Sequence, residues 1–357
     1  MFVKSRDERL AKGFCVHTLT MRISRWLAIP LIAALCFGTT GSGARAAGTI
    51  RIMVGGVEKQ IYLPAKLAEQ LGYFKEEGLD VELLSAPSGV DAEDEMLAGA
   101  VQGVVGFYDH TIDLQAKGKF VESVVQLSHA PGEVELCAKK SSINSPADWK
   151  GKSLGVTGLG SSTNFLTQYI AVKNGLKPGD ISTLPVGSGN TFVAALRQGK
   201  IDCGMTTEPT VSLLLASNDA KVLIDLRDPA NTAKILGGTY PAASLYMPNA
   251  WVAVHKTETQ KLANAFVKTL RYIATHSAEQ IADKMPADYY AGNRALYVKA
   301  LVEGKGMFTP DGKMPENGPK TVLAVLNAFD RAVQGKTIDL SRTYTTSFVD
   351  AAAKTIK

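Results

Sequence analysis

The chain has 357 residues, 45% of them hydrophobic, and a formal net charge of +5. Residues 1–47 hold seven of its 39 basic and two of its 34 acidic residues, so the remainder carries 32 of each sign. This neutral remainder lacks the basic surface that binding to nucleic acid requires, and no run of Lys or Arg indicates a membrane-surface protein. It contains roughly 310 residues, which predicts two lobes rather than one core.

The first predicted element is an export signal. Arg22 and Arg25 precede an apolar run over residues 26–37, and a stretch of mostly small residues follows at 38–47. A charged, then apolar, then cleavable segment is typical of a secretory signal. The apolar run is short and contains Pro30, whereas a membrane-spanning helix needs about 20 apolar residues. We therefore expect residues 1–47 to be removed and the mature protein to be periplasmic.

Two further expectations concern this terminal segment. The mixed charges of residues 1–20 do not suit a signal, which predicts that translation begins at Met21 and that residues 1–20 are a mis-assigned extension. Cys36 follows Leu35, where lipidation requires a small residue, so we expect no lipid anchor. Cleavage is expected after Ala46 or Ala47.

From Thr49 onward, short apolar runs alternate with amphipathic segments, as in βαβ units on a mainly parallel sheet. The first series is strand 50–54, helix 63–77, strand 79–84, helix 91–98, strand 101–107, helix 111–116 and strand 121–127. The second series is strand 153–156, helix 163–174, strand 181–186, helix 191–198 and strand 201–205. The residues after 251 are predicted to be mostly helical.

Two cysteines, Cys137 and Cys203, follow the signal. An oxidising compartment permits a disulfide between them, but their spacing does not place their Cα atoms within bonding range. Two buried free thiols are the preferred interpretation, and the disulfide is the alternative.

Two glycine-rich turns are candidate anion sites, because each follows a predicted strand and opens a predicted helix. Helix starts expose free N–H groups and partial positive charge, which suit a sulfonate, carboxylate or phosphate. The candidate residues are Ser161, Ser162 and Thr163 in the first turn and Asn190 in the second. Ordinary helix caps are the alternative. The first turn departs from a dinucleotide-binding fingerprint because Thr163 replaces its third glycine.

The end of strand 101–107 is a further candidate, since open α/β sheets bind ligands at such ends. Tyr108 could stack on a ligand, Asp109 could accept a hydrogen bond from it, and His110 could donate one. Alternatively, these residues form a helix cap followed by an exposed histidine. Other candidates from their loop positions are Glu208, Tyr240 and Tyr62. Glu208 could equally cap the helix that follows it.

No catalytic motif is recognisable in the sequence. It contains no Gly-x-Ser-x-Gly, His-Glu-x-x-His, Walker or Cys-x-x-Cys motif, and its histidines are scattered. We therefore predict no catalytic residue, no metal site and no cofactor.

Several stretches together resemble one known family. They are Gly72-Tyr73-Phe74-Lys75-Glu76-Glu77-Gly78-Leu79-Asp80, Ser145-Pro146-Ala147-Asp148-Trp149-Lys150-Gly151-Lys152, Leu196-Arg197-Gln198-Gly199-Lys200-Ile201-Asp202 and Glu208-Pro209. In this order they resemble the periplasmic substrate-binding proteins of ABC importers for nitrate, sulfonates, taurine and thiamine-pyrimidine precursors. The resemblance covers roughly residues 49–255.

The resemblance implies a type II periplasmic-binding-protein-like α/β fold, with two lobes, a ligand cleft and two crossing strands. Lobe 1 is expected at residues 48–140 and 249–357 and lobe 2 at 141–248, with crossings near 139–142 and 247–251. Ser161 to Thr163 would correspond to the anion contacts, and Tyr108 to His110 to the cleft wall of lobe 1. A monomer is expected.

The resemblance implies that the protein captures a small anionic organic solute, such as a sulfonate or carboxylate, and delivers it to an ABC permease in the inner membrane. Thr207 replaces the usual aromatic before Glu208-Pro209, which weakens any choice between sulfonate and pyrimidine. The alternatives are pyrimidine-precursor binding, a ligand sensor, or a pyrimidine-forming synthase. A synthase needs a cofactor-bearing lysine and a positioned histidine inside the cell, so the export signal favours a protein that is not an enzyme.

Overall fold

The computed structural model describes residues 48–290 and 292–356. The predicted export signal, with Met21 and Cys36, lies outside these residues. Within them, every helix is too short or too polar to cross a membrane.

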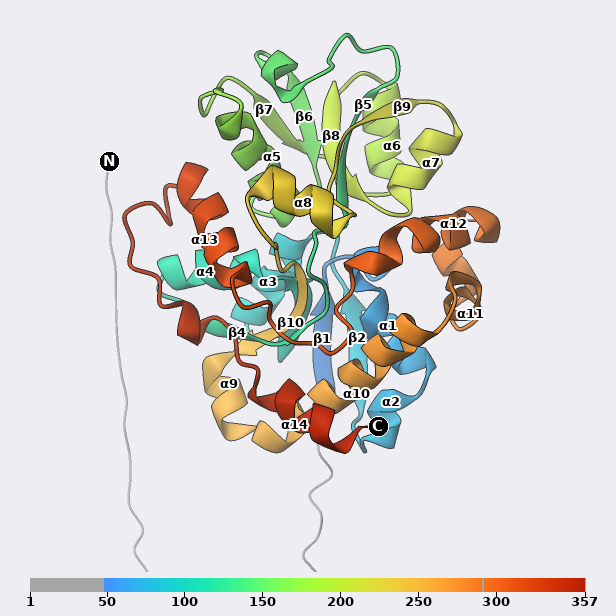
Figure 1. Ribbon diagram of the computed structural model, residues 1–357, viewed down its shortest axis with the longest axis vertical. Helices are drawn as coiled ribbons and strands as arrows, with labels where there is room; N and C mark the ends of the chain where they lie inside the picture. Colours follow the sequence, from blue (N-terminus) through green and yellow to red (C-terminus); the bar gives the residue numbers. More distant parts are fainter. Residues whose placement is uncertain (1–47, 291, 357) are drawn as a thin grey trace, which may run out of the picture. The chain divides into compact units, whose positions relative to one another are not determined.

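The first sheet has five strands in the order β2-β1-β3-β10-β4 (Figure 1). They are β1 Ile50–Val54, β2 Val81–Ser85, β3 Gly103–Phe107, β4 Val121–Gln126 and β10 Ala243–Pro248. β1 runs parallel to β2 and β3, whereas β10 runs antiparallel to β3 and β4. The central strands β3 and β10 are buried almost throughout, as expected of strands covered on both faces.

The second sheet repeats this plan in the order β7-β6-β8-β5-β9. Its strands are β5 Glu133–Ala138, β6 Ser153–Val156, β7 Ser182–Pro185, β8 Cys203–Thr207 and β9 Ala220–Asp225. β6 runs parallel to β7 and β8, and β5 runs antiparallel to β8 and β9. Two mixed sheets confirm the predicted architecture of two α/β lobes.

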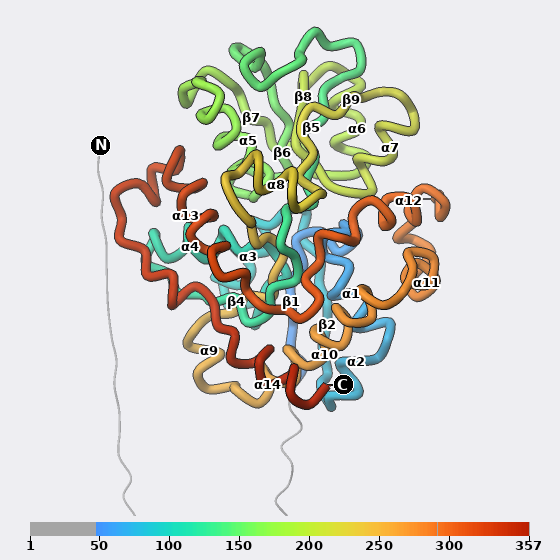
Figure 2. The backbone as a smooth tube through the Cα atoms, in the orientation of Figure 1, coloured from blue at the N-terminus to red at the C-terminus, as the bar shows by residue number. Residues whose placement is uncertain are grey.

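The chain passes between the sheets earlier than expected. Figure 2 traces both passes, from β4 to β5 and from β9 through α8 (Pro229–Leu236) to β10. The predicted crossings near 139–142 and 247–251 are therefore wrong, because β5 belongs to the second sheet and β10 to the first. Below, lobe 1 is the first sheet with its helices and lobe 2 is the second sheet with its helices.

The helices of lobe 1 come from both ends of the described chain, so this lobe carries both blue and red segments in Figure 1. They are α1 Leu63–Gln70, α2 Tyr73–Glu76, α3 Gly89–Leu97, α4 Asp109–Ala116, α9 Asn249–Val254, α10 Lys256–Thr275 and α14 Ser347–Thr355. The single helix predicted over 63–77 is split at Gly72, whose φ of 76° is left-handed and ends a helix readily.

Lobe 2 is covered by α5 Ser162–Lys173, α6 Asn190–Arg197 and α7 Thr210–Ala216. The C-terminal segment adds α11 Ala278–Ala282, α12 Arg294–Gly304 and α13 Gly318–Phe329. α12 contacts α7, and α13 contacts both α5 and α4. The C-terminal segment therefore touches both lobes.

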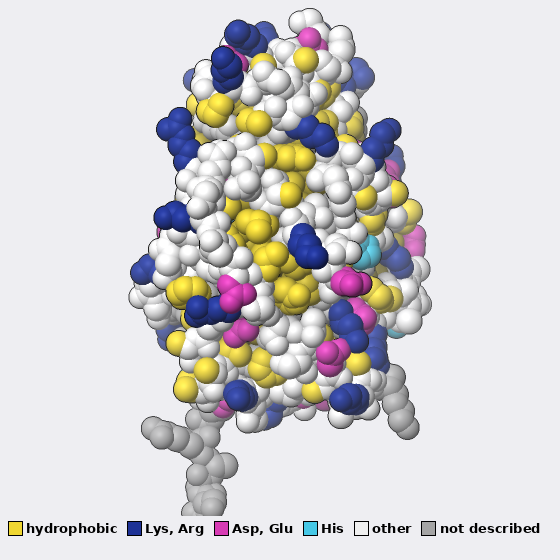
Figure 3. All heavy atoms as spheres, turned by 60° about the vertical axis from the view of Figure 1, so that its left-hand side comes forward, with side chains coloured by type: hydrophobic (Ala, Val, Ile, Leu, Met, Phe, Trp, Pro, Cys, Tyr) yellow, Lys and Arg dark blue, Asp and Glu magenta, His cyan; other side chains and the backbone are white. Residues whose placement is uncertain are grey.

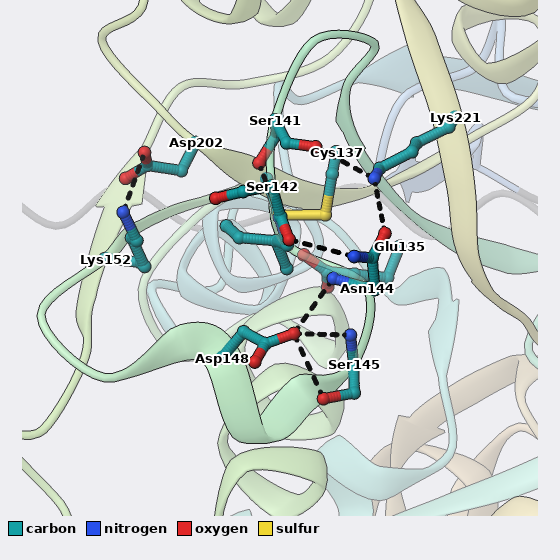
Figure 4. The surroundings of a disulfide bond; sticks show 12 residues. Glu135, Cys137, Ser141, Ser142, Asn144, Ser145, Asp148, Lys152, Asp202 and Lys221 are labelled. Carbon is teal, nitrogen blue, oxygen red and sulfur yellow. Dashed lines mark hydrogen bonds and ion pairs between the residues drawn. A yellow bond between two sulfur atoms is a disulfide. The ribbon is translucent and has the colours of Figure 1, made fainter.

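Cys137 and Cys203 form a disulfide, so the preference for free thiols is wrong. The two residues lie directly opposite each other where β5 pairs with β8. The sequence-based prediction omitted β5, and with it the pairing that brings the cysteines together. Figure 4 shows the adjoining loop, where Lys221 donates to Ser141 O and to Asn144 Oδ1, each at 2.9 Å.

Charged side chains of both signs are interspersed on the face shown in Figure 3, around a central apolar area. This mixture agrees with the balance of 32 basic and 32 acidic residues after residue 47.

Candidate functional site

The glycine-rich turn before α5 meets lobe 1 directly. Ser162 Oγ donates to Asp109 Oδ2 at 2.7 Å, and Ser161 Oγ accepts from the backbone N–H of Val90 at 3.2 Å. Thr163 Oγ1 instead accepts from Thr157 N at 3.0 Å and closes its own turn. The two serine hydroxyls therefore fasten lobe 2 to lobe 1.

Gly158 permits this close approach. A Cβ atom at Gly158 would lie 2.7 Å from Ser88 Oγ of lobe 1 and 3.1 Å from Ser161 Oγ. Ser88 is itself fixed, because its hydroxyl caps α3 by accepting from Asp91 N. Glycine is thus required at residue 158 by contact between the lobes.

Asp109 is the centre of the lobe 1 wall, at the point where β3 leads into α4. Its side chain is fully buried, and Oδ2 accepts from Tyr240 Oη at 3.0 Å as well as from Ser162. Its other oxygen, Oδ1, has no hydrogen-bond partner among the described residues. Burial raises the pKa of Asp109, although His110, Ser162 and Tyr240 oppose that rise.

His110 follows on the same wall and is also buried. Its Nδ1 contacts Glu93 Oε2, and its ring stacks on Tyr246 with centroids 6.3 Å apart. Burial alone would lower the pKa of His110, but the charge and hydrogen bond of Glu93 outweigh it and raise that pKa to about 9. The ring is therefore an imidazolium at neutral pH. Its Nε2 lies 3.9 Å from Asp109 Oδ1 and makes no hydrogen bond within the described part of the chain.

Lys59 and Glu133 complete the charged groups of the site. Lys59 Nζ donates to Gly55 O at 2.6 Å and to Pro87 O at 3.1 Å, and burial lowers its pKa to about 8. Glu133, at the start of β5, is 2% exposed, and its Oε2 has no partner in residues 48–290 and 292–356. Burial raises the pKa of Glu133 well above its usual value, and the charge of Asp109 adds to the rise.

These groups surround a cavity of about 10 Å³ between the lobes. That volume holds about one water molecule, so the cleft is closed. The lining residues are Lys59, Ile61, Tyr62, Gly89 and His110 from lobe 1, and Glu133, Thr157, Ser161, Ser162, Thr163 and Thr207 from lobe 2.

Five of the ten predicted ligand residues line this cavity, namely Tyr62, His110, Ser161, Ser162 and Thr163. Asp109 and Tyr240 adjoin it through the hydrogen bonds to Ser162 and to each other.

Tyr108, Glu208 and Asn190 lie elsewhere. Tyr108 Oη is hydrogen-bonded to Thr343 Oγ1 and so points to the C-terminal segment. Glu208 accepts from Arg227 Nη1 at 2.9 Å and from Ser212 N at 3.0 Å. Asn190 lines a separate hollow of about 140 Å³ beside Tyr289.

Sequence reasoning missed Lys59, Glu133 and Thr207. Lys59 lies in a polar loop after β1 that matches no motif. Glu133 and Glu135 alternate with apolar residues in β5, and this pattern could have revealed buried carboxylates on one face of a strand. Among the described residues, no group of three or more His, Cys, Asp or Glu side chains is arranged to hold a metal ion.

Comparison with solved structures supports the fold. A structure from Bordetella bronchiseptica RB50 is 36% identical, covers 87% of this chain and 98% of its own, and has a TM-score of 0.82. The alkanesulfonate-binding protein SsuA from Xanthomonas axonopodis pv. citri, bound to MOPS, is 16% identical, covers 85% and 100%, and has a TM-score of 0.69. The second likeness concerns the fold alone, and it confirms the type II periplasmic-binding-protein fold.

Comparison with curated proteins identifies relatives of a different kind. The 4-amino-5-hydroxymethyl-2-methylpyrimidine phosphate synthase THI13 of Saccharomyces cerevisiae is 31% identical over 176 residues, which is 49% of each chain. The chain thus spans about half the length of such curated relatives. The NMT1/THI5 like family matches residues 62–280, which is more than half of the sequence, and the chain therefore belongs to the NMT1/THI5-like family.

Proposed function

We propose that this chain is an exported solute-binding protein that closes its two lobes on a small organic solute and delivers it to an ABC permease. The observation that carries the proposal is the cavity between the lobes, which is lined by His110 and Glu133, whose Nε2 and Oε2 atoms make no hydrogen bond to the described residues. Buried polar atoms without partners are costly and therefore rare. A ligand would supply the missing partners.

The contacts across the cleft suit reversible closure. Besides the two serine hydroxyls, Gln60 N of lobe 1 donates to Glu208 O of lobe 2 at 3.1 Å. Arg227 of lobe 2 also donates to Glu303 on α12 at 2.9 Å. Such bonds can be exchanged for water when the lobes separate, as in hinge motions that enclose a ligand.

An acidic group of the solute is best placed between His110 and the start of α5. The imidazolium of His110 supplies positive charge, and the first turn of a helix supplies N–H groups that suit an anion. A sulfonate or carboxylate end therefore fits this side of the cavity.

A pyrimidine-forming synthase is the second candidate, because Lys59 and His110 line the same cavity. These are the two residue types that such chemistry requires, and the pKa of Lys59 is lowered to about 8 by burial. However, Lys59 Nζ is held by two backbone carbonyls, Gly55 O and Pro87 O. These contacts do not fit a cofactor-bearing lysine and favour the binding protein.

The first test is calorimetric titration of the purified protein with a panel of sulfonates, carboxylates and pyrimidines. We expect one class to bind with a Kd of about 1 μM or tighter, or about −8 kcal/mol. Folded protein that binds no class would contradict the proposal. A visible absorbance band in fresh protein that disappears in Lys59→Arg would instead favour the synthase.

A matched pair of histidine variants locates the binding. His110→Gln should weaken binding of the tightest panel member about tenfold or more, because a hydrogen bond to a charged group is lost. His129→Gln, whose Nε2 contacts Gly306 O outside the cavity, should change the affinity less than about twofold. Equal effects of the two variants would place the ligand elsewhere.

Export is tested separately by N-terminal sequencing of protein from the periplasmic fraction. Cleavage after Ala46 or Ala47 would give a mature chain that begins at Ala47 or Gly48. If the protein is found uncleaved in the cytoplasm, it does not deliver a solute to an ABC permease from the periplasm.

A further inference from the structure

Glu133 has no evident structural role for its charge. Its side chain is 2% exposed and lines the cavity, and its Oε2 accepts no hydrogen bond from residues 48–290 and 292–356. The nearby cation Lys59 directs its Nζ to Gly55 O and Pro87 O. Across the cleft, Asp109 Oδ1 accepts no hydrogen bond from the described chain but lies 3.9 Å from His110 Nε2, which offsets its charge. Glu133 Oε2 is therefore the carboxylate oxygen of the cavity lining that is left for a ligand, and it can only accept when ionised.

Glu135 provides a contrast on the same strand. It lies two residues further along β5, so its side chain leaves the same face of the sheet as that of Glu133. Glu135 Oε2 accepts from Thr167 Oγ1 at 3.3 Å, whereas its Oε1 has no hydrogen-bond partner among the described residues, and Glu135 does not line the cavity. The two buried carboxylates differ mainly in whether they face the space between the lobes.

This arrangement restricts the ligand. Nitrate or a simple sulfonate offers only acceptor atoms, so it would leave Glu133 Oε2 without a donor. An ionised carboxylate that is buried without a partner is strongly unfavourable, which is why burial raises the pKa of Glu133. A ligand N–H group would supply the donor that stabilises ionised Glu133, while His110 Nε2 and the start of α5 bind an acidic end.

We propose that Glu133 determines specificity by accepting a hydrogen bond from an N–H group of the ligand, so that the cleft selects solutes that carry an amino group. The inference rests on the proposed function of the cleft and names the class of solute. Glu133 then contributes to ligand binding as well as to β5.

The test compares probes that differ only in an amino group, by calorimetric titration of the intact protein. The pairs are taurine with ethanesulfonate, β-alanine with propionate, and aminopyrimidine with pyrimidine. In the pair that binds, we expect the amino member to bind at least about tenfold more tightly, because it makes hydrogen bonds to a charged acceptor. Glu133→Gln should abolish most of this preference, whereas Glu135→Gln should keep it within about twofold.

The glutamine variant also separates two roles of Glu133. A neutral carboxyl that donated to an anion would be replaced well by the Gln amide, so unchanged affinity in Glu133→Gln would overturn the inference. Equal affinity of the wild type for both members of a pair would overturn it too, while leaving the solute-binding function intact. Binding of no probe in any pair would reject both. If near-UV circular dichroism shows that Glu133→Gln is misfolded, the selectivity of the wild type decides alone.

Discussion

The start of α5 and the lobe 1 wall that faces it use their polar groups in opposite ways. At α5, the hydroxyls of Ser161, Ser162 and Thr163 are all engaged in protein hydrogen bonds. On the wall, Asp109 Oδ1 and His110 Nε2 lie 3.9 Å apart and make no hydrogen bond to the described residues. The conspicuous hydroxyls thus hold the closed lobes together, and the atoms left for a ligand belong to buried charged residues.

The largest loss of stability is expected at Arg227, which lies outside the cavity. Arg227 donates to Asp225 at 2.6 Å and to Glu208 and Glu303 at 2.9 Å. Arg227→Ala should lower the free energy of unfolding by about 3–5 kcal/mol in urea titrations, because buried Glu208 loses its cation. Glu303→Gln, at a partly exposed carboxylate, should cost less than about 1 kcal/mol. Equal losses would mean that Arg227 stabilises the fold mainly through Glu303 and not through buried Glu208.

The next largest effect is expected at Asp109. Asp109→Ala leaves Ser162 Oγ and Tyr240 Oη without their acceptor, and we expect the free energy of unfolding to fall by about 3 kcal/mol. Asp94→Ala, at an exposed position on α3, is the control and should stay within about 0.5 kcal/mol of the wild type. If Asp109→Ala loses no more stability than the control, the hydrogen bonds that Asp109 accepts from Ser162 and Tyr240 do not stabilise the lobe 1 wall.

The pH dependence of stability tests whether buried carboxyls are neutral in the closed protein. Burial raises the pKa of Glu135 to about 8, although Thr167 opposes the rise. Between about pH 4.5 and 8 the folded protein therefore keeps a proton that the unfolded chain releases, so stability should fall as pH rises. The contribution of Glu135 approaches about 1.4 kcal/mol per pH unit.

Urea titrations of wild type and Glu135→Gln at pH values of about 5 and 6.5 measure that contribution. The variant should show a flatter profile, but not a level one, because burial also raises the pKa of Glu133 and Asp109. His110, with a folded pKa of about 9, adds a loss of the same sign at higher pH, above about 6.5. Identical slopes in the two proteins would show that Glu135 is ionised in the fold.

The smallest effect is expected at Ser162. Ser162→Ala removes one hydrogen bond between the lobes and should cost about 1 kcal/mol of stability. Affinity for a ligand should fall by no more than about fivefold, because closure alone is weakened. Ser182→Ala, at an exposed position on β7, is the control. An affinity loss well beyond tenfold would return Ser162 to the role of a direct ligand contact.

Much of the fold could be predicted because its evidence is local. The alternating apolar runs located β1 to β4 and β6 to β8 within a few residues. Membership of a sheet is not local, since β10 is inserted antiparallel between β3 and β4, which lie more than 100 residues earlier, and β5 lies antiparallel between β8 and β9. Glu133 and Glu135 also interrupt the apolar pattern of β5, which concealed the strand and the disulfide that it carries.

The site was less predictable because neighbours in sequence point to different places. Tyr108 and His110 follow the same strand, yet one contacts Thr343 and the other lines the cavity. Glu208 was recognised as a candidate from its loop position, but its partner Arg227 lies nineteen residues away. Lys59 and Glu133 match no motif, and only folding brings them to one cavity.

The insertion of β10 between β3 and β4 sets an order for folding during synthesis. β4 has hydrogen-bonded strand neighbours only in β10, so it stays unpaired until residue 248 has been made. All strands of lobe 2 lie within residues 133–225, and this lobe can fold first. The late pairing joins distant segments, which slows folding. During synthesis the first sheet is therefore completed after the second, although it contains the first strand of the chain.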